Sequence, residues 1–258
     1  MKKKRIGIMG AMPEEISGII PLIENKQEKT IGKRTYISGQ ISGIDTVLVF
    51  SRWGKVAAAA TVAALIHEFG VTELIFTGVA GAIHHELKIG DIVIAKRLIQ
   101  HDMDARPLMP QYEIPLLSKT FFETGSAELE LAVNATEMLL NPENISRLIG
   151  DDELEKFEIR KPKLYVGDIG SGDQFFSGHE QKDQLLGQLP TLLCVEMEGA
   201  AVAQVCYEYE IPFVIIRAIS DVADDNSHID FLAFIREISS RYSTEIIRNI
   251  YQLAQAKM

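Results

Sequence analysis

Short runs of β-branched residues alternate along the chain with longer segments in which apolar residues recur at helical spacing. The short runs predict strands at residues 5–9, 34–38, 46–50, 74–77, 91–95, 163–167, 192–195 and 212–220. The longer segments predict helices at residues 55–69, 126–140, 143–157, 197–209 and 231–254. This alternation predicts an α/β fold in which residues 1–258 form a single domain. We expect a three-layer sandwich, with a central mixed, twisted β-sheet flanked by helices.

Composition and charge narrow the class of partner. The 258 residues include 26 Lys and Arg against 36 Asp and Glu, which gives a formal net charge of −10. Apolar residues make up 47% of the chain, enough for a full hydrophobic core. A protein that binds nucleic acid needs cations to neutralise phosphates, so a nucleic-acid partner is not expected. A small neutral or cationic substrate fits this charge better.

Cysteine usage and hydropathy predict a cytoplasmic protein. Cys194 and Cys206 lie in apolar surroundings, and their spacing matches neither a metal knuckle nor a disulfide framework. We interpret them as buried thiols of a reducing compartment. The longest uncharged apolar run, 56–66, is too short to span a bilayer, and Pro13 and Glu14 interrupt the N-terminal segment before it resembles a signal peptide.

Acidic residues gather where predicted strands end. Five segments that follow strands contain small residues, and four of the five also carry acids: 10–15, 77–81, 170–176, 196–199 and 217–221, of which only 77–81 has no acid. In open α/β sheets, ligands bind at the carboxyl ends of the strands. The sequence therefore predicts that several carboxylates converge on one pocket.

Each of these acids also has a simpler explanation. Glu15, Glu196 and Glu198 would interact favourably with the positive end of a helix, and Asp221 would cap a turn. The glycine-rich segments match neither a dinucleotide-binding nor a P-loop fingerprint. Only the coincidence of the acids at strand ends favours a site.

Other candidate motifs are weaker. The segments 84–85 and 101–104 contain histidines without the spacing of metal ligands, so we expect a surface or loop role and no metal. Ser171 lacks the Gly-x-Ser-x-Gly spacing of a nucleophile elbow. Trp53 follows a strand end, where it would belong either to the core or to a pocket wall.

Taken together, these motifs resemble a known family. The sequence is similar to the 5′-methylthioadenosine/S-adenosylhomocysteine nucleosidases of the nucleoside phosphorylase superfamily, in order from Ile6 to about Phe234. The motifs that carry the resemblance are Gly10-Ala11-Met12-Pro13-Glu14-Glu15, Ser51-Arg52-Trp53-Gly54-Lys55-Val56-Ala57, Thr77-Gly78-Val79-Ala80-Gly81, Gly90-Asp91-Ile92-Val93, Ser171-Gly172-Asp173-Gln174-Phe175, Val195-Glu196-Met197-Glu198 and Arg217-Ala218-Ile219-Ser220-Asp221-Val222-Ala223-Asp224. The Val-Glu-Met-Glu and Arg-Ala-Ile-Ser-Asp motifs are the most specific of these.

The resemblance implies hydrolysis of the bond between adenine N9 and ribose C1′. Asp221 would bind the purine and protonate N7, Glu15 would activate the attacking water, and Arg217 would orient the water or a carboxylate. Glu198 would bind the ribose hydroxyls and Glu196 would support it. The resemblance implies that the remaining substrate-binding residues are Met12, Trp53, Val79, Phe175, Phe176, Met197, Ser220 and Phe231. It also implies a homodimer and no cofactor.

Elementary chemistry agrees with this assignment. Breaking an N-glycosidic bond creates a cation-like sugar and a poor leaving group, so the site needs a proton donor at the base and negative charge near the ribose. Burial beside other carboxylates would raise the pKa of Asp221 and keep it protonated. A phosphorylase would instead need cationic side chains to bind phosphate. The segment Pro13-Glu14-Glu15, which follows the first predicted strand, places carboxylates where the phosphate would have to lie. Water is therefore the expected nucleophile.

The sequence departs from the family pattern mainly at the 5′ end of the substrate. Val79 stands where these nucleosidases often carry Ser, and Arg52-Trp53 replaces a small and aliphatic pair in the turn that lines the 5′ pocket. The 101–118 segment, which in the family contributes to the neighbouring subunit's pocket, has Leu108 but lacks the expected aromatic residues. The polar segment 141–161 is longer than usual.

Three alternatives remain open at this point. One is a purine nucleoside phosphorylase, and a second is a nucleosidase for another adenine nucleoside such as aminodeoxyfutalosine, whereas 5′-deoxyadenosine is a further candidate substrate within the main assignment. The third is a nucleoside-binding or sensing protein that has the fold without catalysis, because a fold does not determine function.

Overall fold

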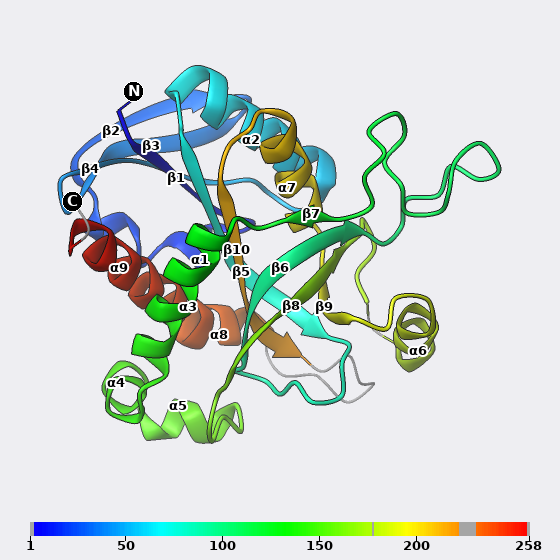
Figure 1. Ribbon diagram of the computed structural model, residues 1–258. Helices are drawn as coiled ribbons and strands as arrows, with labels where there is room; N and C mark the ends of the chain where they lie inside the picture. Colours follow the sequence, from blue (N-terminus) through cyan, green and yellow to red (C-terminus); the bar gives the residue numbers. More distant parts are fainter. Residues whose placement is uncertain (1–2, 177, 222–230, 257–258) are drawn as a thin grey trace.

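A ten-stranded mixed sheet runs through the computed structural model, which describes residues 3–176, 178–221 and 231–256 (Figure 1). The strands are β1 (Arg5–Gly10), β2 (Glu24–Ile31), β3 (Arg34–Ile41), β4 (Ile44–Phe50), β5 (Glu73–Ala82), β6 (Ile92–Gln100), β7 (Phe122–Glu123), β8 (Leu164–Ser171), β9 (Leu192–Glu196) and β10 (Phe213–Asp221).

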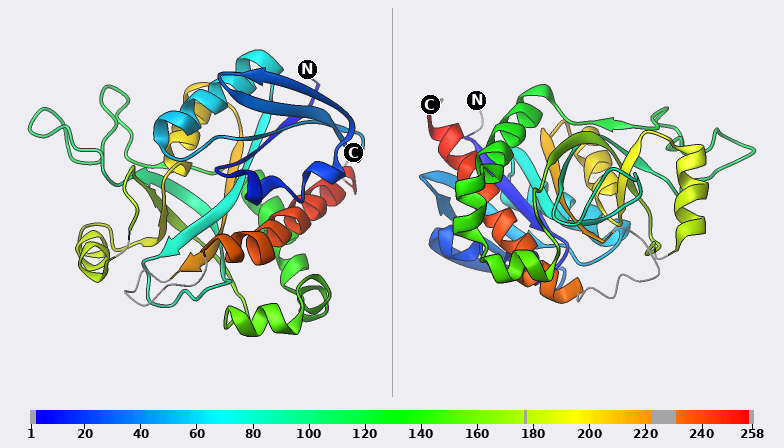
Figure 2. Two further views of the ribbon diagram at one scale, coloured as in Figure 1. Left: turned by 180° about the vertical axis from the view of Figure 1, so that it is seen from behind. Right: turned by 90° about the horizontal axis from the view of Figure 1, so that it is seen from below.

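Helices cover both faces of this sheet (Figures 1 and 2). They are α1 (Pro13–Ile16), α2 (Lys55–Phe69), α3 (Ser126–Leu140), α4 (Pro142–Leu148), α5 (Asp151–Lys156), α6 (His179–Gln188), α7 (Gly199–Glu208), α8 (Phe231–Phe234) and α9 (Ser240–Ala256), with a 3₁₀ turn η1 (Ile20–Leu22) and a π-helical turn η2 (Ile235–Ser239) that joins α8 to α9. The predicted fold class, a mixed sheet between layers of helices, is confirmed.

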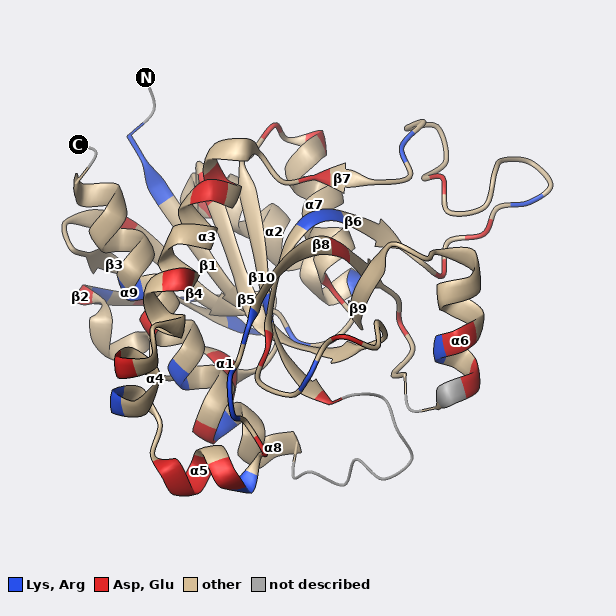
Figure 3. Ribbon diagram, turned by 60° about the horizontal axis from the view of Figure 1, so that its bottom comes forward, with Lys and Arg blue, Asp and Glu red and all other residues tan. Residues whose placement is uncertain are grey.

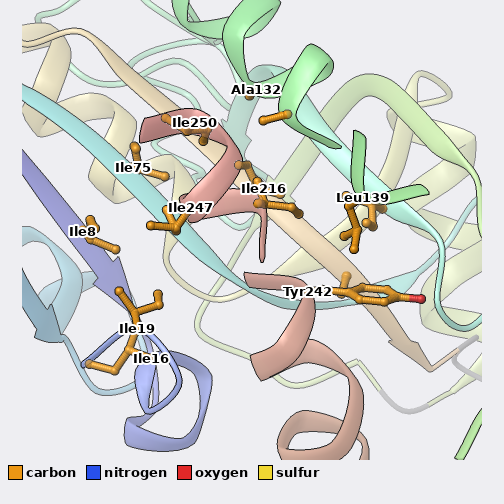
Figure 4. Packing of buried hydrophobic residues seen from close by; sticks show 14 of the residues in the cluster. Ile8, Ile16, Ile19, Ile75, Ala132, Leu139, Ile216, Tyr242, Ile247 and Ile250 are labelled. Atoms are coloured by element: carbon orange, nitrogen blue, oxygen red, sulfur yellow. The ribbon is translucent and has the colours of Figure 1, made fainter. Parts of the chain in front are cut away.

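Alternation along the central strands produces two cores. In β5, Ile75 faces the core formed with α1, α3 and α9, whereas Leu74 and Phe76 face the core formed with α2 and α7. In β10, Ile216 faces the first of these cores and Ile215 the second, because successive side chains of a strand point to opposite faces of the sheet. Figure 4 shows the first core, in which side chains of α9 pack between β1, β5 and α3.

The sheet also closes on itself. β10 pairs in parallel with β5 and antiparallel with β6, while β6, β8 and β9 lead back to β5. The carboxyl ends of β1, β5 and β10 therefore lie together, and β9 crosses the end of β5 where Val195 is opposite Gly81. The sequence did not predict this closure, which brings the carboxyl ends of β1, β5 and β10 close to the end of β9.

Several element boundaries differ from the prediction. β2 was not predicted because its side chains are almost all exposed and polar, so it has no hydrophobic period. The predicted helix 143–157 is divided into α4 and α5 at Ile149 and Gly150. β5 continues to Ala82 and β8 to Ser171, so the glycines of these motifs lie within strands. The motif residues 222–224 lie outside the described residues.

Membrane insertion was not expected from the sequence. Within the part of the chain that the structure describes, no helix is long and apolar enough to cross a bilayer.

Candidate active site

One cavity collects residues from all five strand-end segments. It encloses about 670 Å³ of empty space, part of which is open to solvent. It is lined by Ala11, Met12, Glu15, Trp53, Val79, Ala80, Gly81, Gln174, Phe175, Phe176, Val195, Glu196, Met197, Glu198, Ser220, Asp221 and Phe231. Every residue that the sequence analysis assigned to the site is among them except Arg217.

Glu15 is held from three sides at the start of α1. Its side chain is buried, and its carboxylate accepts hydrogen bonds from the backbone N–H groups of Ala11 (2.6 Å), Met12 (2.9 Å) and Val79 (3.2 Å). Gly78 permits this approach, because a Cβ there would lie 2.7 Å from Glu15 Oε1. Burial raises the pKa of Glu15, and the charge of Arg217 together with the backbone donors partly opposes the increase.

Arg217 lies behind the cavity wall and contacts Glu196. Its Nη2 is 2.6 Å from Glu196 Oε2, and both side chains are at most 4% exposed. The guanidinium also lies 4.0 Å over the ring of Phe76. Of the two roles expected for Arg217, the contact supports orientation of a carboxylate, that of Glu196. Arg217 is not among the residues that line the cavity.

Glu196 accepts hydrogen bonds from both side chains and backbone. Besides Arg217, it accepts hydrogen bonds from the backbone N–H groups of Glu198 (3.2 Å) and Gly199 (2.8 Å) and from the hydroxyl of Ser171. These contacts fix the carboxylate of Glu196 at the end of β9.

Glu198 is the second acid of this motif. It lies at the N-terminus of α7, its side chain is 5% exposed, and Oε1 accepts a hydrogen bond from Gly54 N at 2.7 Å. Burial and the neighbouring charge of Glu196 raise the pKa of Glu198 to about 8. The raised pKa favours the protonated form of Glu198.

Asp221 ends β10 and is half-buried. Ser220 Oγ donates to Asp221 Oδ2 at 2.9 Å, and Gly81 of β5 allows the carboxylate to approach, because a Cβ there would lie 3.0 Å from Oδ1. The side chain of Ser220 also contacts the carbonyl of Ala80 at 3.4 Å. The paired strands β5 and β10 thus fix this acid at the cavity.

Aromatic side chains form the exposed part of the wall. Trp53 and Phe175 are 60% and 65% exposed, and the ring of Phe175 is perpendicular to that of Phe231 at 6.5 Å. The ring of Phe176 meets the edge of His101 at 5.2 Å. Of the two roles left open for Trp53, the pocket wall is therefore the one that the structure supports.

Sequence reasoning missed two supporting groups. Ser171 lies opposite Glu196 in the β8–β9 ladder, and its hydroxyl donates to that acid and accepts from Ala200 N at 2.7 Å. Gly54, with φ at +91°, presents its N–H to Glu198. For Ser171, the sequence offered one signal of a supporting role, namely a small hydroxyl residue in the segment that follows a predicted strand.

The histidine segments hold no metal cluster in the described chain. No group of three His, Cys, Asp or Glu side chains is placed to bind a metal ion within residues 3–176, 178–221 and 231–256. His101, which was expected in a surface or loop role, lies in the turn that directly follows β6, where it is half-buried beside Phe176. The rings of His84 and His85 stack on each other at 4.5 Å.

Comparisons with known proteins agree with this geometry. The sequence model described as Phosphorylase superfamily matches residues 5–250. The chain is 36% identical to the 5′-methylthioadenosine/S-adenosylhomocysteine nucleosidase of Shewanella denitrificans over 90% of its own length and 92% of the relative.

Two solved structures are also similar over nearly the whole chain. The nucleosidase of the same name from Neisseria meningitidis, in complex with methylthio-immucillin-A, has a TM-score of 0.83 and 31% identity, covering 96% of this chain and 98% of that one. The futalosine hydrolase of Helicobacter pylori has a TM-score of 0.80 and 32% identity, covering 97% and 98%. The chain therefore belongs to the phosphorylase superfamily, and the resemblance to its methylthioadenosine/adenosylhomocysteine nucleosidases is confirmed.

Proposed function

We propose that the protein hydrolyses the N-glycosidic bond of 5′-methylthioadenosine and S-adenosylhomocysteine, releasing adenine and the 5-substituted ribose. 5′-Deoxyadenosine is a further candidate substrate. The observation that carries this proposal is a cavity lined by Glu15, Glu196, Glu198 and Asp221 and, among the described residues, by no Lys or Arg.

The proposed reaction uses two acids for proton transfer. Glu15 accepts a proton from a water molecule, whose oxygen forms a bond to C1′ of the ribose. The C1′–N9 bond breaks, its electron pair goes to the adenine, and Asp221 gives a proton to N7. The burial that raises the pKa of Glu15 makes it a stronger base than an exposed glutamate.

The other residues of the cavity would bind the substrate. We assign Glu198 to the ribose hydroxyls and Glu196, which accepts a hydrogen bond from Glu198 N, to the support of Glu198. The ring of Phe175 would stack on the base, and the backbone of Phe176 would read its Watson–Crick edge. The lining residues Met12, Trp53, Val79, Met197, Ser220 and Phe231 would contact the sugar and the 5′ group.

Water is favoured over phosphate as the nucleophile. A phosphorylase must bind a phosphate dianion with cationic side chains or free N–H groups. The guanidinium of Arg217 is paired with Glu196, and the N–H groups of Ala11, Met12 and Val79 donate to Glu15. These contacts support hydrolysis.

The direct test is chromatographic. Purified protein is incubated with methylthioadenosine, adenosylhomocysteine, 5′-deoxyadenosine and aminodeoxyfutalosine, each with and without phosphate, and free adenine is measured. Adenine release that does not depend on phosphate is expected. A strict phosphate requirement would contradict the proposal in favour of a phosphorylase.

The same assay addresses the other two alternatives. The similarity to the Helicobacter futalosine hydrolase is the specific observation in favour of an aminodeoxyfutalosine-type substrate. Turnover of that nucleoside alone would move the assignment to it. Binding of these nucleosides in calorimetry, without turnover of any of the four in the assay, would identify a nucleoside-binding or sensing protein.

We further propose that the protein is a homodimer. The segment between β6 and β7 projects from the body as two loops (Figures 1 and 2), and Leu108 and Leu116 on it are 89% and 96% exposed. Large exposed apolar side chains support a protein interface.

The oligomeric state is tested by light scattering after gel filtration. One chain has a mass of 28.7 kDa, and the wild-type protein should give twice this value. The Leu108→Asp variant should shift the measured mass toward that of the monomer. A monomeric wild type would contradict the proposal.

Two broader expectations remain proposals. Residues 1–258 are proposed to form one domain, which is supported by a single family match over residues 5–250 and one continuous sheet. A cytoplasmic location is supported by Cys194 and Cys206, both free and buried. Cooperative unfolding and cell fractionation, respectively, test them.

A further inference from the structure

The segment 149–159, which contains α5, packs against the helix that contributes Phe231 to the cavity. Phe157 is 1% exposed, and its ring meets that of Phe234 edge to face at 5.5 Å. Phe234 is the last residue of α8, and Phe231 is its first. A single turn of helix therefore connects the residue that Phe157 contacts with Phe231.

Ion pairs add a second connection between α5 and the same helix. Lys156 Nζ lies 2.8 and 2.7 Å from the two carboxylate oxygens of Glu237 in η2. At the start of α9, Arg241 contacts Glu153 of α5 at 3.2 Å. Figure 3 shows the acidic α5 beside α8. Exposed pairs contribute little stability, so their main effect is on the orientation of α5.

The end of the segment supports the other side of the cavity. Ile159 packs on Gly90, where a Cβ would lie 2.8 Å from the Ile159 side chain. Gly90 N donates to Ile219 O at 2.9 Å, and Ile219 N donates to Asp91 O at 2.8 Å. Ile219 precedes Asp221 by two residues in β10. One segment therefore contacts the supports of both Phe231 and Asp221.

From these contacts we propose that residues 149–159 are a brace that fixes α8 so that Phe231 is held against the cavity. Phe157 is the positioning residue, because it makes the buried contact. The brace lowers the cost of ordering Phe231 when a nucleoside binds, which increases affinity without contact between the brace and the ligand. Only the choice of ligand in the test rests on the proposed function.

The first test does not need a ligand. Phe157→Leu retains an apolar side chain and removes the edge-to-face contact. Hydrogen exchange at the amides of residues 231–239 is measured in this variant and in wild type. Faster exchange confined to these residues is expected. Unchanged exchange would overturn the brace, whatever reaction the protein catalyses.

The second test measures coupling to Phe231. Affinity for methylthio-immucillin-A is measured by calorimetry in wild type, Phe157→Leu, Phe231→Ala and the double variant. Phe157→Leu is expected to weaken binding by up to about tenfold, the upper end of what one aromatic pair contributes. It should have no further effect when Phe231 is absent, because the brace acts through that ring. Additive losses would overturn the proposal, since they would indicate a general effect on the fold.

Charge reversal provides a matched control. Lys156→Glu should weaken binding and Glu237→Lys should restore it in the double variant, whereas Lys161→Glu, the same change at an exposed site just after the brace, should have no effect. Equal effects of the two lysine variants would mean that net charge, not the brace, is responsible. If wild type bound no methylthio-immucillin-A, the proposed function would fail, while the hydrogen-exchange result would still decide the brace.

Discussion

The acids and the aromatic residues of the cavity differ in how firmly they are held. The side chains of Glu15, Glu196 and Glu198 are almost fully buried, and each accepts at least one hydrogen bond from the backbone. Trp53 and Phe175 line the same cavity but are 60% and 65% exposed. We call the first group, together with Asp221, the acidic wall, and the second, together with Phe231, the aromatic rim.

This difference separates chemistry from specificity. Groups that act on developing charge must be held before the reaction begins, because reorganising them would raise the barrier. An exposed apolar rim accommodates substituents of different size at smaller cost. Changes in the acidic wall should therefore affect rate and stability strongly, and changes in the rim should mainly alter the preference among substrates.

The largest expected effect is that of Asp221→Asn. An amide cannot donate the proton that adenine needs, so kcat should fall by about 10²–10⁴-fold. Affinity for methylthio-immucillin-A should change much less, because the amide retains the size of the side chain. Steady-state adenine release and calorimetry measure the two quantities. Asp183→Asn on the exposed face of α6 is the control, and retention of wild-type kcat in Asp221→Asn would remove Asp221 from the proposed mechanism.

Arg217→Met tests whether the acidic wall depends on its buried cation. The substitution leaves the carboxylate of Glu196 buried without its guanidinium, which should reduce the free energy of unfolding by about 3–5 kcal/mol. Adding Glu196→Gln removes the unpaired charge and should recover part of the loss. Urea unfolding measures both variants. A single variant as stable as wild type would show that the backbone donors and Ser171 alone are sufficient for Glu196.

The stability of the acidic wall should depend on pH through Glu198. The pKa of Glu198 is raised from 4.5 to about 8 in the folded protein, so between these values the folded state holds a proton that the unfolded chain has released. The stabilisation that results is fully present below pH 4.5 and is lost as the pH increases toward about 8. Glu198→Gln should therefore flatten the decline of the free energy of unfolding across this window.

Urea unfolding at a series of pH values measures this decline. Glu155→Gln, a change at an exposed acid of α5, should give the wild-type profile. If the profiles of Glu198→Gln and wild type were parallel, Glu198 would not be the group responsible.

The sequence predicted the acidic wall better than its supports. Glu15, Glu196, Glu198 and Asp221 were found because strand ends are recognisable and acids there are unusual. The role of Ser171 depends on its register opposite Glu196, and the pairing of Arg217 depends on the closure of the sheet. Neither pairing follows from local periodicity, which describes each strand but not its neighbours.

Prediction of the helices and strands has the same limit, because local patterns do not describe contacts between residues distant in sequence. α2 was predicted from Lys55 to Phe69 because Gly70 provides a stop signal, and the left-handed Gly70 does end it. β2 was missed because an exposed polar edge strand leaves no hydrophobic pattern. The segment 141–161 was recognised as long, but its packing on α8 involves Phe157 and Phe234, which are distant in sequence.

The smallest predicted effect concerns the aromatic rim. Trp53 lies between Arg52, whose φ is +74°, and Gly54, whose N–H donates to Glu198, so the turn holds the indole at the cavity although most of it is exposed. Trp53→Ile should widen the opening where the resemblance places the 5′ group. The ratio of kcat/KM for adenosylhomocysteine to that for methylthioadenosine should increase by about three- to tenfold, at the lower end of what one apolar contact contributes.

Competition between the two nucleosides in one assay gives this ratio directly. Val56→Ala, on the exposed first turn of α2 and not among the residues of the cavity, should leave the ratio unchanged. If Trp53→Ile lowered kcat equally for both nucleosides, the indole would be supporting Glu198 through the turn at Gly54, and Trp53 would belong with the acidic wall. A change in the ratio at constant kcat would confirm that the rim selects the substituent while the acids perform the chemistry.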